Sequence, residues 1–250
     1  MCERLDNWRT NLRLTLRTKL EPAVSLLQAN KRGPHKTVFF PDGQRYQGEW
    51  LNNLRHGKGS QFYKNGSKYE GNWKEGMRHG LGILWNCDSK RFRVKYSGEW
   101  RDDIPHGMGT HYDEHGNVYE GNWVTGQRSG LGKMTYESGS VDIPSDIYEG
   151  EWQSDMRHGR GTMTYAQQNV YEGHWEKNVR KGTGSMFFVS KGTRFDGIWF
   201  NDVPKTGRYS ELETSGPSTL PVLELQNPES VLEKAYLGCS SHIAEPMQKA

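Results

Sequence analysis

Over most of the chain, apolar and polar residues alternate around a recurring motif: an aromatic residue, any residue, glycine, any residue, tryptophan. Side chains two positions apart point to the same face of a β-strand, so the ring, the glycine and the tryptophan of each copy should share one face. The copies begin at Tyr46, Tyr69, Tyr96, Tyr119, Tyr148, Tyr171 and, as a variant, Phe195. The pattern therefore predicts seven strands of one design.

A Gly-x-Gly motif follows the tryptophan of each of the first six copies at a fixed offset. This spacing predicts a loop of about four residues, as at 74–77, and a second strand that returns antiparallel to the first. The register expected in the second copy places Trp73 opposite Arg78, Gly71 opposite Gly80 and Tyr69 opposite Gly82. Glycines in these positions would leave room for a ring to lie across the neighbouring strand.

The second turn of each unit carries residues typical of tight hairpins where it is short, at Asp42-Gly43, Asn65-Gly66 and His115-Gly116. Two longer units place their extra residues in this same turn, near 86–94 and 138–146, where they leave the strand register intact. Each hairpin can bury its rings only by stacking on its neighbours. The predicted fold is all-β: an elongated, single-layer antiparallel β-meander of seven hairpins over residues 33–207, with short helical or irregular caps at both ends.

Residues 69–82 read Tyr-Glu-Gly-Asn-Trp and then His-Gly-Leu-Gly, which resembles the MORN (membrane occupation and recognition nexus) repeat. The resemblance covers residues 33–207. It implies a non-catalytic array that joins proteins together, often in the cytoskeleton and including cilia and sperm flagella, and the family name implies lipid surfaces as well. Some MORN proteins carry a kinase or methyltransferase domain beyond their repeats, and the residues after 207 are too few for one.

The two ends of the chain have other patterns. Residues 1–32 form a basic amphipathic segment, which fits a cap on the first hairpin, a partner-docking helix or a membrane-surface helix. Alternating leucines at 12, 14 and 16 leave a strand open as well. The docking candidates are Trp8, Arg9, Arg13 and Arg17. In the tail, 208–250, Asn227 and Pro228 predict the start of a short helix over about 228–237.

Composition supports a folded repeat rather than a disordered chain. Only 33% of the 250 residues are hydrophobic and the mean hydropathy is −0.92, yet 9 Trp, 12 Tyr and 8 Phe supply large apolar rings. Lys and Arg balance Asp and Glu at 21 each over residues 37–203, which argues against nucleic acid as a partner. Three scattered cysteines, no signal segment and no membrane-length apolar run indicate a cytoplasmic protein with free thiols.

Acidic residues and histidines recur at fixed positions of the repeat and could suggest a catalytic or metal site. Acidic residues follow the first ring at Glu70, Glu120, Glu149, Glu172 and Asp196, and a ladder of this kind indicates architecture rather than a catalytic pair. Histidines recur at 56, 79, 106 and 158, and copies one repeat apart are about 10 Å from each other, too far to share a metal ion. No cofactor, metal site or catalytic residue is expected, and the chain is not predicted to be an enzyme.

Basic residues recur five positions after the tryptophans, at Arg55, Arg78, Arg128, Arg157 and Arg180, and Pro105 breaks the series. Three interpretations are open. The arginines could form cation–π contacts with the tryptophans, they could be solvated side chains at strand ends, or they could face an acidic partner or a phosphoinositide head group.

The leading interpretation is a scaffold whose outward-facing rings and arginines bind partner proteins. The candidates for this surface are Tyr69, Trp73, Arg78, Tyr96, Trp100, Tyr119, Trp123, Arg128, Tyr148, Trp152 and Arg157. A partner, a second copy or a terminal helix should cover so large an apolar face. The resemblance places such a scaffold in a cytoskeletal assembly of the axoneme, flagellum or sperm acrosome region. The alternative is a peripheral membrane module that binds anionic phospholipid. Monomer and homodimer both stay open.

Overall fold

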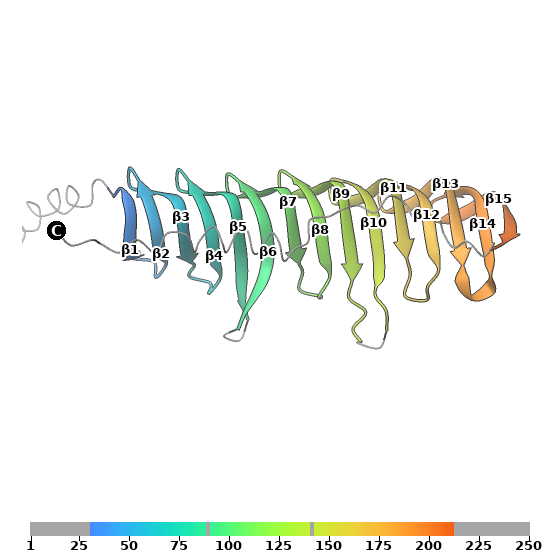
Figure 1. Cartoon of the computed structure of the whole chain (residues 1–250), viewed down its shortest axis with the longest axis horizontal. Helices are drawn as coiled ribbons and strands as arrows, with labels where there is room; N and C mark the ends of the chain where they lie inside the picture. The colour runs from blue at the N-terminus through green and yellow to red at the C-terminus, as the bar shows by residue number, and fades with distance from the viewer. Residues whose placement is uncertain (1–30, 89–90, 141–142, 213–250) are drawn as a thin grey trace, which may run out of the picture.

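The computed structural model describes residues 31–88, 91–140 and 143–212. They form one antiparallel sheet of 15 strands, which pair strictly in sequence order from β1 to β15 (Figure 1). The strands are β1 (Gly33–Phe39), β2 (Arg45–Leu51), β3 (Leu54–Phe62), β4 (Lys68–Lys74), β5 (Met77–Asp88), β6 (Arg91–Arg101), β7 (Ile104–Tyr112), β8 (Val118–Val124), β9 (Gln127–Tyr136), β10 (Asp146–Gln153), β11 (Met156–Thr164), β12 (Val170–Glu176), β13 (Val179–Phe188), β14 (Thr193–Phe200) and β15 (Val203–Glu211). The single described helical turn is η1 (Val189–Lys191).

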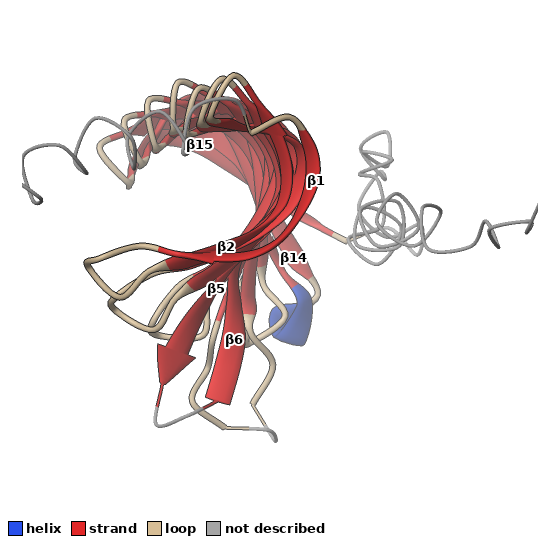
Figure 2. Ribbon diagram, turned by 90° about the vertical axis from the view of Figure 1, so that its left-hand side faces the viewer, coloured by secondary structure: helices blue, strands red, loops and turns tan. Residues whose placement is uncertain are grey.

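The predicted β-meander of seven hairpins is confirmed. Strands β2 to β15 form the seven hairpins, and β1 adds one strand ahead of the first motif. The last strand continues to Glu211, beyond the expected end of the array at 207. Viewed along its length, the sheet curls into an open trough (Figure 2). The expected caps, in residues 1–32 and 228–237, lie almost wholly outside the described residues.

The register within the hairpins differs from the expected one. The observed pairs are Trp73 with Arg78, Gly71 with Gly82 and Tyr69 with Leu84. The first expected pair is confirmed and the other two are wrong. A β-bulge causes the difference: Gly80 has a φ of +66°, in the left-handed region, and β5 carries two more residues than β4 between the paired positions.

The turns after the tryptophans are also tighter than expected. Lys74 and Met77 pair as strand residues, so only Glu75 and Gly76 form the turn, with φ values of +51° and +86°. Positive φ at both central residues is the type I′ geometry, which matches the twist of the flanking strands. These turns all lie along one side of the sheet, which we name the short-turn edge.

The other ends of the strands form the long-turn edge, where both predicted insertions lie (Figure 1). One lengthens the hairpin of β5 and β6, and the other forms the loop between β9 and β10. The short turns here have glycine at positive φ, as at Gly43, Gly66 and Gly116. The predicted hairpin turns and the confinement of the insertions to this edge are confirmed.

The glycines of the motif are required because strands and rings approach too closely for any side chain. A Cβ built on Gly71 would collide with the Cα of Gly82, and a Cβ built on Gly82 would collide with the phenol of Tyr69. The ring therefore does lie across a glycine of the neighbouring strand, as expected, although the two residues are not directly paired.

Candidate docking surface

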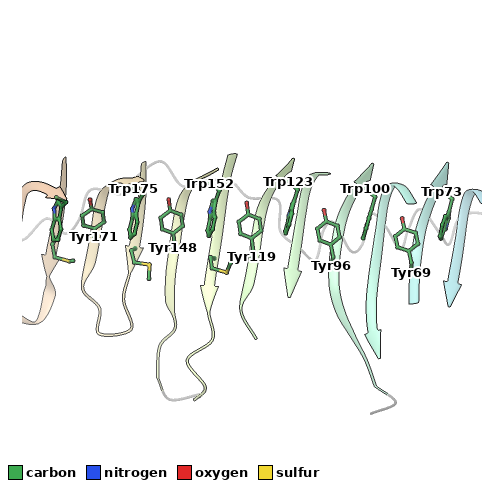
Figure 3. Packing of buried hydrophobic residues seen from close by; sticks show 14 of the residues in the cluster. Tyr69, Trp73, Tyr96, Trp100, Tyr119, Trp123, Tyr148, Trp152, Tyr171 and Trp175 are labelled. Carbon is green, nitrogen blue, oxygen red and sulfur yellow. The ribbon is translucent and has the colours of Figure 1, made fainter. Parts of the chain in front are cut away.

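The aromatic residues of the motif form one continuous row along the sheet, which we name the ring row (Figure 3). Tyrosine and tryptophan alternate, and successive rings meet edge to face. Tyr69 lies 5.1 Å from Trp73 of its own repeat and 5.4 Å from Trp100 of the next, measured between ring centroids. This spacing and the near-perpendicular planes are the favoured geometry for aromatic pairs. The row therefore couples each repeat to its neighbours.

Hydrogen bonds fix both kinds of ring. The hydroxyl of Tyr69 donates to the carbonyl oxygen of Asn72, at 3.0 Å. The indole nitrogen of Trp73 donates to the carbonyl oxygen of Gly59 in the preceding repeat, at 3.1 Å. The same indole bond recurs from Trp100, Trp123, Trp152, Trp175 and Trp199. The tyrosine hydroxyl and the indole N–H are thus both hydrogen-bonded within the array.

Burial corrects the expectation that the rings face outward. The candidates Tyr69, Trp73, Tyr96, Trp100, Tyr119, Trp123, Tyr148 and Trp152 are all buried, with at most 7% of any of them exposed. Neighbouring rings and the residues packed on them cover their faces, so they are the core of the protein. No separate cover is needed for them. Contact between these rings and a partner stays a prediction.

Burial also sets the protonation of the tyrosines. It raises the pKa of Tyr96, Tyr119 and Tyr148 well above the ordinary value, and that of Tyr171 to about 12. The phenols therefore stay neutral hydrogen-bond donors at neutral pH.

The arginines cover the ring row, and each reaches forward to the next repeat. The guanidinium of Arg78 lies 4.1 Å from the ring of Trp100, and it donates to the Asp103 carboxylate at 2.9 Å. Arg128 repeats the arrangement with Trp152 and Asp155. Arg157 covers Trp175 and donates to the carbonyl oxygen of Asn178. The cation–π interpretation is confirmed, but the tryptophan belongs to the following repeat.

The arginine pairing changes what the candidates Arg78, Arg128 and Arg157 can offer a partner. Their charges are already matched by rings and by a carboxylate or carbonyl of the next turn. An acidic partner or lipid head group would have to displace these contacts. The arginines therefore act first as connections between repeats.

Polar residues on the opposite face have structural contacts too. Glu149 pairs with Lys133 at 2.8 Å, and Glu151 accepts a hydrogen bond from the backbone nitrogen of Arg160 at 2.8 Å. Glu49 and Glu99 accept equivalent bonds from the bulges of their own hairpins. Across residues 31–88, 91–140 and 143–212, no group of three His, Cys, Asp or Glu side chains could hold a metal ion.

An exposed apolar row on the short-turn edge, which we name the apolar row, is not among the residues predicted from the sequence. Its members are Leu51, Leu54, Ile104, Val124, Phe200 and Val203, each 41–51% exposed. They flank the two-residue turns, and the position four residues after the tryptophan is apolar in six of the seven copies. That periodicity was available in the sequence. An exposed apolar row of this kind is typical of an interaction surface.

The N-terminal docking candidates Trp8, Arg9, Arg13 and Arg17 lie outside the described residues. No helix in the described part of the chain is both long and apolar enough to cross a membrane.

Comparison with known proteins agrees with this architecture. A model of the MORN repeat matches six segments: 46–68, 69–91, 96–117, 119–141, 148–170 and 171–193. The hairpin of β14 and β15 adds a seventh unit, with Phe195 in the place of tyrosine and a bulge of one extra residue where the other hairpins have two. MORN repeat-containing protein 3 of Xenopus laevis is 54% identical to this chain over 33 residues. The matched stretch spans 13% of this chain and 14% of that relative's length. MORN repeats are generally interaction modules for proteins or membranes, and the repeat itself is a non-enzymatic module.

Proposed function

Because the chain belongs to the MORN repeat family, we propose that it is a non-catalytic scaffold that holds partner proteins along the short-turn edge of its sheet. The observation that carries the proposal is the exposed apolar row on that edge, whose members lie in the first, third, fourth and last hairpins. The rings of the ring row are buried in packing, whereas the side chains of the apolar row remain exposed to a partner.

The geometry of the array supports this proposal. All 15 strands belong to one sheet, and the ring row joins every repeat to the next. Nearest-neighbour packing of this kind holds distant repeats in a fixed order along the trough. Two partners bound at different repeats would therefore be kept at a defined separation.

The test is affinity purification of the intact chain against two variants, read by mass spectrometry. The first variant replaces Leu54, Ile104 and Val124 by asparagine, which removes the apolar row from the first, third and fourth hairpins without changing a residue of the ring row. A matched control replaces Ile143 and Val189 by asparagine as well. These two residues lie at the long-turn edge and are 53% and 42% exposed. Circular dichroism checks that both variants fold. We expect specific partners to be lost from the first and kept by the control, and equal retention by both would contradict the proposal.

We further propose that the scaffold works in a cytoskeletal assembly of the axoneme, flagellum or sperm acrosome region. The support is the family resemblance of the repeats. Fluorescent tagging of the intact chain in ciliated and sperm-forming cells tests this location. A purely diffuse cytoplasmic signal would contradict it.

One observation favours a second function, binding to anionic phospholipid. The hairpin of β5 and β6 projects from the long-turn edge (Figure 2), and Phe92, 50% exposed, lies there between the exposed Arg91 and Arg93. An exposed ring on one face of a projecting hairpin, with two arginines on the other face, suits an anionic membrane surface. This function predicts salt-sensitive binding to vesicles that contain phosphatidylserine, lost after Phe92→Ser with Arg91→Ser, or after removal of residues 1–32. Unchanged binding of all these variants would contradict it.

A further inference from the structure

One junction in the array lacks the arginine that covers the ring row everywhere else along hairpins two to seven. Arg55, Arg78, Arg128, Arg157 and Arg180 lie 4.1–4.6 Å from the tryptophan of the following repeat. Pro105 occupies the equivalent position in front of Trp123, and within the described stretches no lysine or arginine lies over that ring. The nearest ring outside the row is His111, 6.0 Å away between centroids. Trp123 thus lacks the cation that its counterparts have.

The partner of the missing arginine is also absent at this junction. At Arg78, Arg128 and Arg180, the backbone N–H and the guanidinium both donate to one aspartate of the next turn. The equivalent turn residue after Trp123 is Gly126, and Pro105 has no N–H to donate. The two substitutions match, because a proline has no backbone N–H that would need the aspartate. The backbone carbonyl of Gly126 is still present.

A second junction shows what a guanidinium does when the turn has no aspartate. Arg55 lies 4.4 Å from the ring of Trp73 and donates to the carbonyl oxygen of Gly76, at 2.8 Å. Gly76 and Gly126 hold the same place in their turns, with φ values of +86° and +80°. The Trp123 junction therefore has the ring and the carbonyl that bind a guanidinium elsewhere in the same molecule.

The surface in front of this junction is hollowed. A hollow of about 500 Å³ is lined by Tyr96, Pro105, His111, Trp123 and Gly126, among others. Its arginines, Arg78 and Arg128, are paired with Asp103 and Asp155. Lys95 and Asp113 add one charge of each sign, and burial lowers the pKa of His111, so that side chain is neutral at pH 7. The hollow carries no net charge that would repel an incoming cation.

We propose that this hollow, which we name the Trp123 slot, receives an arginine side chain from a partner protein. The guanidinium stacks on Trp123 and donates to the carbonyl oxygen of Gly126, completing the row of cations from outside. A guanidinium suits the slot better than an ammonium because it presents a flat face to the ring and N–H groups at its edge. This inference rests on the proposed scaffold function and specifies one contact of it.

The test follows Trp123 by nuclear magnetic resonance while acetyl-arginine amide is added to the full chain. The control ligand is acetyl-citrulline amide, which has nearly the same shape and no charge. Two variants complete the series. Gly126→Asp supplies the aspartate found at three other junctions, and Asp103, Asp155 and Asp202 show that this residue tolerates the required φ. Pro105→Arg combined with Gly126→Asp fills the slot from within the chain.

The expected result is a saturable shift of the Trp123 indole resonances with the arginine ligand and none with citrulline. Binding should tighten severalfold in Gly126→Asp and be lost in the double variant, whose amide spectrum shows that it is folded. No shift with arginine, an equal shift with citrulline, or binding that survives in the double variant would overturn the slot. The scaffold proposal is judged separately, by the partners lost from the short-turn edge.

Discussion

At the scale of single residues, glycine determines how tightly the repeats pack. In the fourth hairpin, a Cβ on Gly121 would lie 2.5 Å from the Cα of Gly132 and 2.5 Å from the carbonyl oxygen of Leu131. Both contacts are with backbone, which cannot rotate away. The motif glycines are therefore required by close approach, whereas several turn glycines stand in open space.

Gly121→Ala is expected to destabilise the array by about 1–3 kcal/mol or more, because the strands must separate to admit the methyl group. Gly139→Ala is the matched control, since nothing lies within 4 Å of its Cβ position and only its φ of +73° resists substitution. Urea unfolding followed by tryptophan fluorescence measures both. Equal losses would show that close approach is not what selects glycine at position 121.

His111 is expected to make stability depend on pH. Burial, and secondarily the charge of Lys95, lower its pKa below the ordinary value of 6.5. Arg128 lowers it further, while Asp113 and Asp155 act in the opposite direction. Below about pH 6.5 the unfolded chain binds a proton that the folded chain resists, so stability falls as the pH falls through that value.

His111→Met should remove this part of the acid sensitivity, since methionine occupies the same position at 134, 163 and 186. Thermal unfolding of both proteins from pH 7.5 to 5 measures the effect. A difference in melting temperature that stays constant over this range would contradict the assignment.

At the scale of elements, the sequence predicted the strands, their pairing order, the long-turn hairpins and the edge that carries the insertions. Those features follow from period-two patterning and turn chemistry within one repeat. The sequence predicted the pair next to the turn, Trp73 with Arg78, but not the register beyond it. The bulge depends on Gly80 taking a left-handed φ, and the Gly-x-Gly spacing alone does not show this. The sequence pattern also placed the rings on the surface. Their cover comes from the neighbouring repeats and from Arg78 and its counterparts, which only the three-dimensional stacking brings together.

The junctions between hairpins should be adjustable one at a time. Replacing Pro105 by arginine and Gly126 by aspartate should stabilise the third junction by about 1 kcal/mol, from a cation–π contact and a capped backbone N–H. Differential scanning calorimetry would show a higher melting temperature than for the wild type. The reverse change, Arg128→Pro, should lower it, because Asp155 would lose both its donors. A decrease for the first variant would mean that Pro105 contributes packing that an arginine cannot replace.

At the scale of the whole molecule, stability is shared along one dimension. Each strand pairs only with its sequence neighbours, and the ring row links repeat to repeat without any contact that closes the array. The effect of a substitution on unfolding should therefore depend on the position of the residue along the array as much as on its burial. Trp123 and Trp199 allow this to be tested, since both are buried, at 7% and 4% exposure, in the middle and at the end of the row.

Trp123→Ala and Trp199→Ala should each remove about 3–5 kcal/mol of local packing, because the rings are similarly buried. The consequences should differ. Trp123 contacts Tyr96 and Tyr119 on its two sides, so its loss interrupts the row and lets the two halves unfold separately. Trp199 contacts Tyr171 and Phe195 in the last repeats, so its loss should loosen β14 and β15 alone. Hydrogen exchange read by mass spectrometry resolves the two patterns: faster exchange around the third and fourth hairpins for the first variant, and faster exchange confined to the last hairpin for the second. The same pattern in both variants, or cooperative loss of protection over the whole sheet, would show that the array unfolds as one unit and not repeat by repeat.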